Sequence, residues 1–426
     1  MRVLLVLCLS VAISARQLQL ASLVFRHGDR SPAGTFPTDP HQVDQWPQGW
    51  GQLTQAGMLQ HYNLAQELLM KRYMTKGTET FLLSSSYKRD EIYVRSTDLD
   101  RTLMSAECLM AALYKPNGHQ AFLKDFDWQP IPIHTVPVPE DKLLRGHYVC
   151  PRYKKLREEG TNDADYVEVM EQNKDLFARV KKNAGIDYDL TIDNVGEIFD
   201  LLFCEKQHKL PWADWVTKED FAALAKVSDF ALYKTFAAKE ILRITAGPLL
   251  GEMLDHMETK RNNGDLKATK MFVYSAHDST LAALLNAFGL YSPDTARPPY
   301  ASIMMIELYL EDDGSSSVEV YYHMGPEADG STDRLALPGC PLPCTLEKFK
   351  AFATSFIPEN FDEECQQSSM TSKLMKSKTG AVAGFFLATA AVAIALVALA
   401  VAFCQSRLPK RRHFCPSNPF CRHLFS

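Results

Sequence analysis

The chain has 426 residues, of which 46% are apolar and 23% are charged, and its net charge is −5. This length allows one large globular unit or two domains, and the composition is ordinary for a globular protein. The mild acidity gives no electrostatic reason to expect nucleic acid as a partner.

The N-terminal residues predict a secretory signal peptide. Met1 and Arg2 precede an apolar run over 3–13, and small residues follow it, which is the layout of a cleaved signal over residues 1–15. The run is too short to span a bilayer. A buried first strand is the less favoured alternative.

Residues 381–403 contain no charged side chain and predict a single transmembrane helix. A helix of this length is about 34 Å long, which is enough to cross the hydrocarbon core of a bilayer. Basic residues follow it: Arg407, Lys410, Arg411 and Arg412. They place the tail, 404–426, in the cytosol. We expect a type I single-pass membrane protein with a lumenal or extracellular domain over 16–372 and a polar stalk over 373–380.

The cysteines of the domain before the span would meet an oxidising compartment, so they are candidates for disulfide bonds. They are Cys108, Cys150, Cys204, Cys340, Cys344 and Cys365. Their spacing leaves many pairings open, although Cys340 and Cys344 could close a tight local loop. Further soft ligands for zinc are not evident near these two residues. The sequence contains no Asn-X-Ser/Thr site for N-glycosylation.

Three short apolar segments predict strands that end in charged residues. Leu18–Phe25 runs into Arg26-His27-Gly28-Asp29-Arg30, Glu91–Val94 ends at Arg95, and Met271–Ala276 ends at His277-Asp278. In open α/β sheets, ligands bind at the carboxyl ends of parallel strands. If the three strands are neighbours, these charged side chains converge on one point.

Helical and loop patterns lie between the strands. We expect helices over Thr54–Tyr73, Asp98–Tyr114 and Thr280–Phe288, a long loop over Ser31–Gly51, an extended Pro130–Pro139 and a hairpin of Ile303–Leu310 with Ser317–Tyr322. The predicted fold is a three-layer α/β core with a mainly parallel sheet and helices on both faces. A smaller helical domain is inserted over about 150–252.

The segment Arg26-His27-Gly28-Asp29-Arg30 has the residues that phosphoryl transfer needs. A neutral imidazole can attack phosphorus and form a phosphohistidine, which splits one displacement into two. Adjacent guanidiniums disfavour the imidazolium and can hold phosphoryl oxygens. Gly28 allows the backbone to turn sharply beside the ligand. Taken alone, the segment is equally compatible with a basic surface turn.

The other two strand ends strengthen this interpretation. Arg95 would be a third guanidinium for the phosphoryl oxygens. His277 can donate a hydrogen bond to the phosphate, and Asp278 can protonate the leaving-group oxygen at the start of a helix. Each residue alone is more often structural, so the prediction depends on all three strand ends.

Residues around these strand ends are interpreted as structural. Asp98, Asp100 and Arg101 follow the second strand and are interpreted as helix-capping and surface-pairing residues. No His-Glu-x-x-His motif, acidic cluster or Walker-type glycine loop occurs in the sequence, so neither a metal nor a cofactor is expected.

Taken together, these segments are similar to the histidine acid phosphatase family, close to its lysosomal, prostatic and testicular members. The likeness extends over about 20–365 and includes further segments: Ile92–Thr102, Pro132–Pro137, Glu140-Asp141, Tyr274–Thr280 and Leu337–Cys340. The resemblance implies an α/β core with a smaller helical domain. It also implies a nucleophilic His27, a proton donor Asp278, and phosphate binding by Arg26, Arg30, Arg95 and His277.

The resemblance further implies a homodimer and the disulfides Cys150–Cys365 and Cys340–Cys344. Two features depart from the family. A third family disulfide would join the position of Cys204 to that of Ile303, so Cys204 either stays free or pairs with Cys108. The cytoplasmic tail lacks the tyrosine of the lysosomal sorting signal, so lysosomal or endosomal delivery and the plasma membrane are equally open.

The sequence therefore predicts an acid phosphatase that hydrolyses phosphate monoesters through a phosphohistidine, in the lumen or outside the cell. Two alternatives remain open. One is a phytase-like or otherwise specialised phosphatase on the same fold. The other is an inactive receptor or adhesion protein derived from a phosphatase, which would be expected to have lost His27 or Asp278.

Overall fold

The structure is a computed structural model that describes residues 16–366 apart from 265, 267 and 327–329. The predicted signal peptide lies outside the described residues, and so do the predicted stalk, transmembrane helix and cytoplasmic tail. Among the described residues, none of the helices combines the length and the apolar character that a membrane span requires.

A seven-stranded sheet forms the centre of the described region. Its strands are β1 (Gln17–Arg26), β2 (Ile92–Ser96), β3 (Met271–Ala276), β4 (Ile303–Leu310), β5 (Ser316–His323), β6 (Thr332–Leu335) and β7 (Cys344–Thr345). They lie in the order β2-β3-β1-β4-β5-β6, and β7 pairs with β5. The three strands that the sequence singled out are therefore neighbours.

The prediction of a mainly parallel sheet is wrong, because the sheet is mixed. The pairs β1–β3 and β2–β3 are parallel, whereas β4 runs antiparallel to β1 and the remaining pairs are antiparallel as well. The connection after β3 brings the chain back to the end of β1, where the N–H of Arg26 donates to Ser302. From there β4 can only run away from that end. The predicted β4–β5 hairpin is confirmed, and its tight turn makes β5 antiparallel too.

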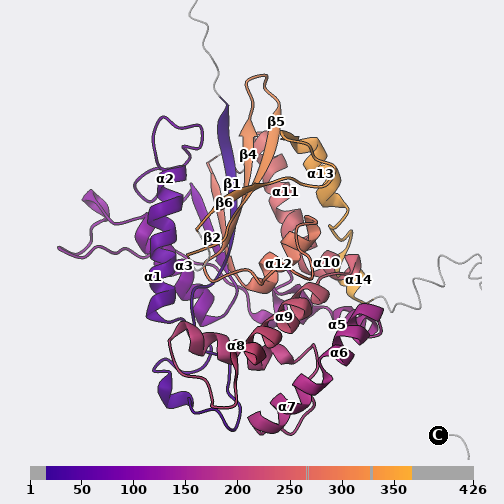
Figure 1. The fold of residues 1–426 in the computed structure, drawn as a ribbon. Coiled ribbons are helices and arrows are strands. Elements are labelled where there is room, and N and C mark those ends of the chain that lie inside the picture. Colours follow the sequence, from indigo (N-terminus) through magenta and orange to yellow (C-terminus); the bar gives the residue numbers. More distant parts are fainter. Residues whose placement is uncertain (1–15, 265, 267, 327–329, 367–426) are drawn as a thin grey trace, which may run out of the picture. The chain divides into compact units, whose positions relative to one another are not determined.

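Helices cover both faces of the sheet, as predicted (Figure 1). One face is covered by α1 (Gln55–Leu64), the π-helical turn η2 (Ala65–Leu69), α2 (Met70–Tyr73) and α3 (Asp100–Leu113). The other is covered by α10 (Lys239–Thr245), α11 (Gly247–Arg261), α12 (Asp278–Ala287) and α13 (Leu346–Thr354). Successive side chains of β1 point to opposite faces of the sheet. Leu23 therefore packs against the helices of the first face and Val24 against those of the second.

The remaining helices gather at the end of the sheet that carries the charged residues (Figure 1). They are α4 (Gly146–Val149), α5 (Pro151–Gly160), α6 (Ala164–Gln172), α7 (Lys174–Ala184), α8 (Val195–Gln207) and α9 (Lys218–Thr235). A separate hydrophobic core joins α6 to α9 with Phe36 of the long loop. In contrast, α10 and α11 share the core of the sheet. The helical segment expected over 150–252 thus divides between two cores.

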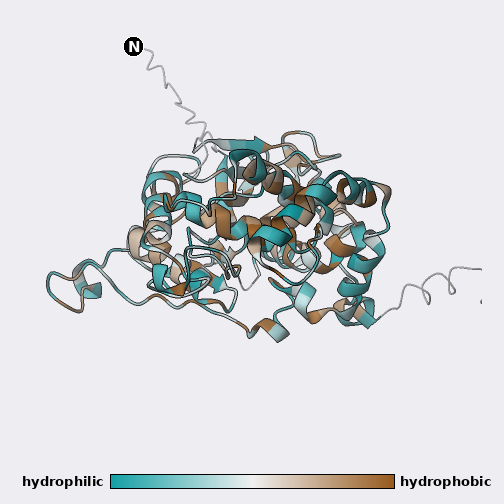
Figure 2. Ribbon diagram, turned by 60° about the horizontal axis from the view of Figure 1, so that its bottom comes forward, coloured by the Kyte–Doolittle hydropathy of each residue, from teal (hydrophilic) through white to brown (hydrophobic). Residues whose placement is uncertain are grey.

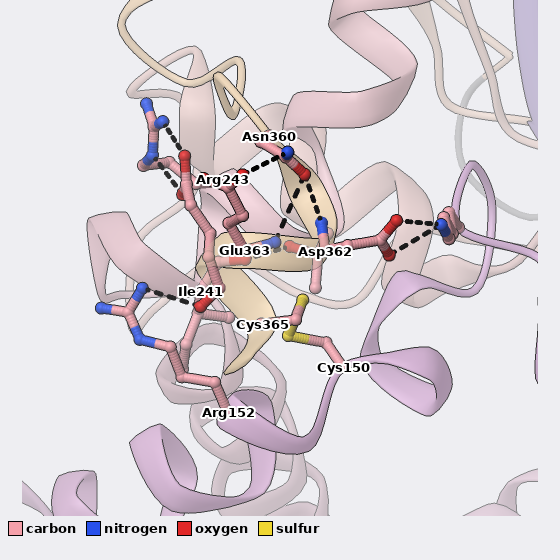
Figure 3. The surroundings of a disulfide bond; sticks show 11 residues. Cys150, Arg152, Ile241, Arg243, Asn360, Asp362, Glu363 and Cys365 are labelled. Carbon is pink, nitrogen blue, oxygen red and sulfur yellow. Dashed lines mark hydrogen bonds and ion pairs between the residues drawn. A yellow bond between two sulfur atoms is a disulfide. The ribbon is translucent and has the colours of Figure 1, made fainter. Parts of the chain in front are cut away.

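Two disulfide bonds are present, Cys150–Cys365 and Cys340–Cys344, with the pairing that the family resemblance implies. Figure 3 shows the first of them, which joins the start of α5 to α14 (Phe361–Gln366). Cys108 and Cys204 are both free, so they do not pair with each other. Cys204 is buried, and its Sγ lies 3.6 Å from the hydroxyl of Tyr300.

The loop that follows α3 projects from the body of the described region in both views (Figures 1 and 2). It follows α3 and contains the short helix η3 (Gly118–Gln120). Two further short helices, η1 (Val43–Gln45) and η4 (Val138–Glu140), lie in other loops. The predicted extended segment Pro130–Pro139 contains one isolated bridge, in which His134 pairs in parallel with Arg95.

Candidate active site

The carboxyl ends of β1 and β3 bring two histidines side by side. Arg26 is in register with Ala276, and the N–H of His27 donates to the carbonyl of Ala276 at 3.1 Å. The next residue on each strand is a histidine, and the imidazole centroids of His27 and His277 are 5.5 Å apart. The expected convergence of 26–30 with 277–278 therefore occurs.

His27 is held as a neutral imidazole with a defined tautomer. His27 as a residue is 2% exposed, and its Nδ1 lies 2.8 Å from the carbonyl oxygen of Gly28. Because a carbonyl oxygen only accepts, Nδ1 carries the proton, which leaves the lone pair on Nε2. Burial, followed by the charges of Arg26 and Arg101, holds the pKa of His27 well below its usual range. An imidazole in this state can act as a nucleophile even in acid.

Gly28 fits where no other residue would. A Cβ on Gly28 would lie 2.4 Å from the carbonyl oxygen of Gly57 on α1, and a Cβ on Gly57 would lie 2.2 Å from the carbonyl oxygen of Asp29. The two backbones therefore cross at contact distance. The N–H of Gly28 also donates to Ser105 on α3, so the segment after β1 is fixed against both helices.

Arg26 and Arg30 are each oriented by a carboxylate. Arg26 is 1% exposed; its Nη1 donates to the carbonyl of Pro298 at 2.7 Å, and its Nη2 lies 3.3 Å from Asp278 Oδ2. Arg30 forms a two-pronged pair with Asp200 of α8, at 2.8 and 2.9 Å. Fixed guanidiniums of this kind suit a tetrahedral oxyanion.

His277 and Asp278 stand at the start of α12. The Nε2 of His277 lies 3.0 Å from the hydroxyl of Thr97, and burial followed by Arg145 and Arg101 keeps its pKa well below the usual range. Burial alone would raise the pKa of Asp278, but nearby guanidiniums, chiefly Arg26, outweigh it and hold that pKa well below the usual range. In the absence of a bound anion, Asp278 is therefore ionised.

Arg95 is not brought into this group. Its Nη2 donates to Asp141 at 2.8 Å, and both side chains are buried. It lines a separate cavity of about 220 Å³ with Glu252 and His256. The physical reason is that β2 continues to Ser96, so Arg95 precedes the strand end and lies opposite Tyr274 in the adjoining strand.

Two other arginines lie where Arg95 was expected. Arg101, in the first turn of α3, contributes to the low pKa of both His27 and His277, and Arg145 contributes to that of His277. Burial, Arg30 and Arg145 lower the pKa of Arg101 to about 10. Within the described part of the chain, no carboxylate forms an ion pair with Arg101 or Arg145.

The sequence held one signal for Arg101. Like Asp278, it stands in the first turn of a helix that follows a strand of this group, and such turns lie at the ligand end of the sheet. Arg145 had no such signal, because it precedes a four-residue helix in a region without strands.

A cavity of about 540 Å³ adjoins the arginines. It runs between the long loop and α8, and it reaches Arg30 and Asp200. Its other lining residues include Phe36, Tyr188, Glu197, Ile198, Leu201 and Arg297. Among the described residues, no three His, Cys, Asp or Glu side chains group as metal ligands.

Known proteins resemble this chain over most of its length. The family model of the Histidine phosphatase superfamily (branch 2) matches residues 17–323. Lysosomal acid phosphatase of Homo sapiens is 42% identical over 359 residues, covering 83% of this chain and 82% of that protein. Prostatic acid phosphatase of Homo sapiens is 39% identical over 362 residues, covering 84% of this chain and 90% of that protein.

Solved structures share the fold at low sequence identity. The apo form of Hafnia alvei phytase aligns with a TM-score of 0.60 at 16% identity, covering 83% of this chain and 99% of that one. At this level of identity, the likeness shows a common fold and nothing about substrate.

The contrast between Arg101 and Arg95 can be tested with matched substitutions. Arg101→Gln should weaken binding of inorganic phosphate by about 10–100-fold, since one charged hydrogen bond contributes about 1.5–3 kcal/mol. It should leave the thermal stability unchanged or higher, because it removes a half-buried cation that has no carboxylate partner among the described residues. Arg95→Gln should lower the free energy of unfolding by about 3–5 kcal/mol, because it leaves Asp141 buried without its partner.

Isothermal titration with phosphate and thermal denaturation measure the two effects. The assignment would be reversed by a stable Arg95→Gln protein that binds phosphate worse than the Arg101→Gln protein.

Proposed function

Because the chain belongs to branch 2 of the histidine phosphatase superfamily, we propose that it is an acid phosphatase, which hydrolyses phosphate monoesters through a phosphohistidine on His27. The observation that carries the proposal is the buried, neutral His27. Its Nδ1 is occupied by the carbonyl of Gly28, and guanidiniums surround it. This arrangement leaves Nε2 as a nucleophile next to a site for the phosphate.

The first chemical step transfers the phosphoryl group to His27. The Nε2 lone pair attacks phosphorus, an N–P bond forms, and the ester P–O bond breaks. Asp278 in its acid form gives its proton to the departing oxygen and becomes a carboxylate. In the second step this carboxylate takes a proton from the attacking water, the N–P bond breaks, and phosphate and neutral His27 are released.

The arginines hold the phosphoryl oxygens during both steps. We assign this role to Arg26, Arg30 and Arg101, with His277 as a further donor. We assign Arg95 to structure because it lines a separate cavity and is paired there with Asp141. A bound phosphate would give Arg101 the anionic partner that no described carboxylate provides. Charge that develops on the phosphoryl oxygens is then met by preorganised donors.

An acid optimum follows from the charge of the site. Asp278 is ionised before substrate binds, so its proton must arrive with the substrate. A phosphate monoester has a second pKa near 6, and below it the monoanion carries a proton. Bound phosphate also offsets the guanidiniums that depress the pKa of Asp278. As pH rises, activity should therefore decline where the substrate monoanion loses its proton. It should not decline at the pKa that Asp278 has before substrate binds.

The cavity beside Arg30 supports a monoester with a modest organic group. It contains the carboxyls of Glu197 and Asp200 as well as Arg297, and its walls include Phe36 and Tyr188. A phytate-like substrate would bring several more phosphates into a cavity with acidic groups. A phosphatase-derived receptor is not favoured either, because His27 and Asp278 are both present at the strand ends.

We also propose the predicted topology, a type I membrane protein with its catalytic domain in the lumen or outside the cell. The support comes from the apolar segments over 3–13 and 381–403, which lie outside the described residues. A lysosomal location is supported by the name of the human lysosomal acid phosphatase, which is 42% identical to this chain. The two disulfide bonds of the described domain also support this topology, because disulfides persist in oxidising compartments such as the lumen or the cell exterior.

A homodimer through the projecting loop after α3 is the third part of the proposal. Exposed apolar side chains gather there: Phe122, Leu123, Phe126 and Trp128. The rings of Phe122 and Phe126 have centroids 5.8 Å apart, and those of Phe126 and Trp128 are 6.0 Å apart. An apolar aromatic cluster on the surface is typical of an interface, and the family resemblance makes a second copy of the chain its occupant.

Replacing the two reacting side chains tests the chemistry. His27→Ala should abolish the acid-labile phosphoenzyme that rapid quenching traps from wild type. Asp278→Asn should still form it, but much more slowly with alkyl phosphates than with para-nitrophenyl phosphate, since a poor leaving group needs the proton more. Glu240→Ala, at an exposed position of α10, is the control and should retain full activity.

The same assay measures pH dependence and metal content. Activity should be highest below neutrality and should survive a chelator. A pH optimum above 7, or a phosphoenzyme that persists in His27→Ala, would contradict the mechanism.

The dimer is tested by sedimentation of the disulfide-bonded domain. Phe122→Ser combined with Phe126→Ser should weaken dimerisation by at least about tenfold, because buried aromatic side chains contribute most of the binding free energy of an interface. Val167→Ser removes an equally exposed apolar side chain from α6 and should leave the dimer intact. A double variant that sediments like wild type would rule out this interface.

A further inference from the structure

Asp29, between His27 and Arg30, is buried and points away from the phosphate site. It is 3% exposed. Its Oδ2 accepts a hydrogen bond from the hydroxyl of Thr54, the N-cap of α1, and lies 2.8 Å from Nε2 of His208. His208 directly follows the last residue of α8. A residue of the helical cap thus contacts the segment that carries the reacting histidine.

Helix α8 holds this segment at more than one place. Asp200 near its middle pairs with Arg30 and also accepts from the N–H of Ala33 at 3.3 Å. His208, two turns further along, contacts Asp29. The sulfur of Cys204 lies between them, 3.8 Å from Arg30 Nη1. The geometry of residues 29–33 therefore depends on the position of α8.

The Asp29–His208 contact changes with the protonation of His208. The hydrogen bond to Asp29 raises the pKa of His208, although partial burial opposes it. The histidine is also flanked by the ring of Trp46, with centroids 5.0 Å apart. A raised pKa in the folded protein means that the ionic contact is complete below about pH 6.5. It is then lost as pH rises through the raised value.

Other charged groups around His208 do not replace this partner. Glu205 on α8 is fully buried and faces Asp39, and burial together with Asp39 raises its pKa to about 9, so it is neutral in acid. Lys206 and Lys209 flank His208 in sequence, and His41 bonds to the carbonyl of Pro211. Among the described groups, Asp29 alone accounts for the raised pKa.

Asp29 in turn depends on His208 for charge compensation. Its Oδ1 is buried without a hydrogen-bond partner among the described residues, and Thr54 is a neutral donor. Its backbone is already fixed, because its N–H donates to Gln60 and its carbonyl accepts from the N–H of Thr54. A buried carboxylate whose cationic partner becomes neutral is destabilised where it lies.

We propose that Asp29 and His208 are positioning residues: protonated His208, paired with Asp29, keeps the segment His27–Arg30 in its phosphate-binding geometry. The pair acts through the backbone and touches neither substrate nor reacting atoms. The protonation of His208 thus contributes to the acid optimum, in addition to the ionisation of the substrate ester. This inference rests on the proposed phosphatase function.

His208→Gln tests the pair, because an amide keeps a hydrogen-bond donor and cannot carry a charge. Its kcat/KM for para-nitrophenyl phosphate at pH 5 should be about tenfold below wild type, since small misplacements of reacting groups have effects of this order or larger. At a pH above the midpoint at which proton NMR shows wild-type His208 to lose its proton, the two proteins should agree within about twofold. Affinity for inorganic phosphate should follow the same trend.

A double-mutant cycle with Asp29→Asn provides the second measurement. If the residues act as one pair, the double variant should be no worse than the worse single variant at pH 5. Glu240→Gln, at an exposed position of α10, is the control and should match wild type at every pH. An equal penalty for His208→Gln on both sides of the His208 midpoint, or fully additive losses, would overturn the positioning role. A wild-type protein without phosphatase activity at any pH would instead refute the proposed function.

Discussion

The positive charge buried around His27 is the constraint on which the rest of the site depends. Arg26 and Arg30 each have a carboxylate partner, Asp278 and Asp200, whereas Arg101 and Arg145 pair with no described carboxylate. Buried cations are unfavourable unless they are paired. The site is therefore incomplete until an anion enters it, and the same charge keeps His27 neutral and its Nε2 available. Phosphate binding and nucleophile activation have one electrostatic origin.

The scaffold holds this charge in place from three sides. The sheet aligns His27 with His277, the Gly28–Gly57 crossing fixes the turn against α1, and α8 orients Arg30 through Asp200. The cap thus does more than cover the site, because it positions residues of the strand end. The cost of bringing like charges together is met by packing and hydrogen bonds at some distance from the phosphate.

Local pattern was enough to predict the elements that carry the chemistry. The three strands, the hairpin, the helices on both faces and the meeting of His27 with His277 were all visible in short segments. The mixed direction of the sheet was not, because it depends on where the loop after α12 returns the chain. The division of the helical region between two cores was not visible either. The sequences of α10 and α11 resemble those of the neighbouring helices, and only their packing partners differ.

The arginines illustrate the same limit at the level of single residues. Arg95 was expected at the site because the strand was predicted to end there. The strand instead continues to Ser96, and Arg95 lies beside Asp141. Arg101 had one signal, its place in the first turn of α3. The Asp29–His208 contact joins residues that are distant in sequence, so the motif alone could not reveal it.

The state of His27 is the central claim, and nitrogen NMR of its imidazole measures it most directly. In the anion-free protein we predict that Nδ1 stays protonated and Nε2 unprotonated at pH 6.5, where a free imidazole would be half protonated. A ring that titrates near 6.5 or above, or a proton on Nε2 with Nδ1 bare, would contradict this account of how the nucleophile is prepared.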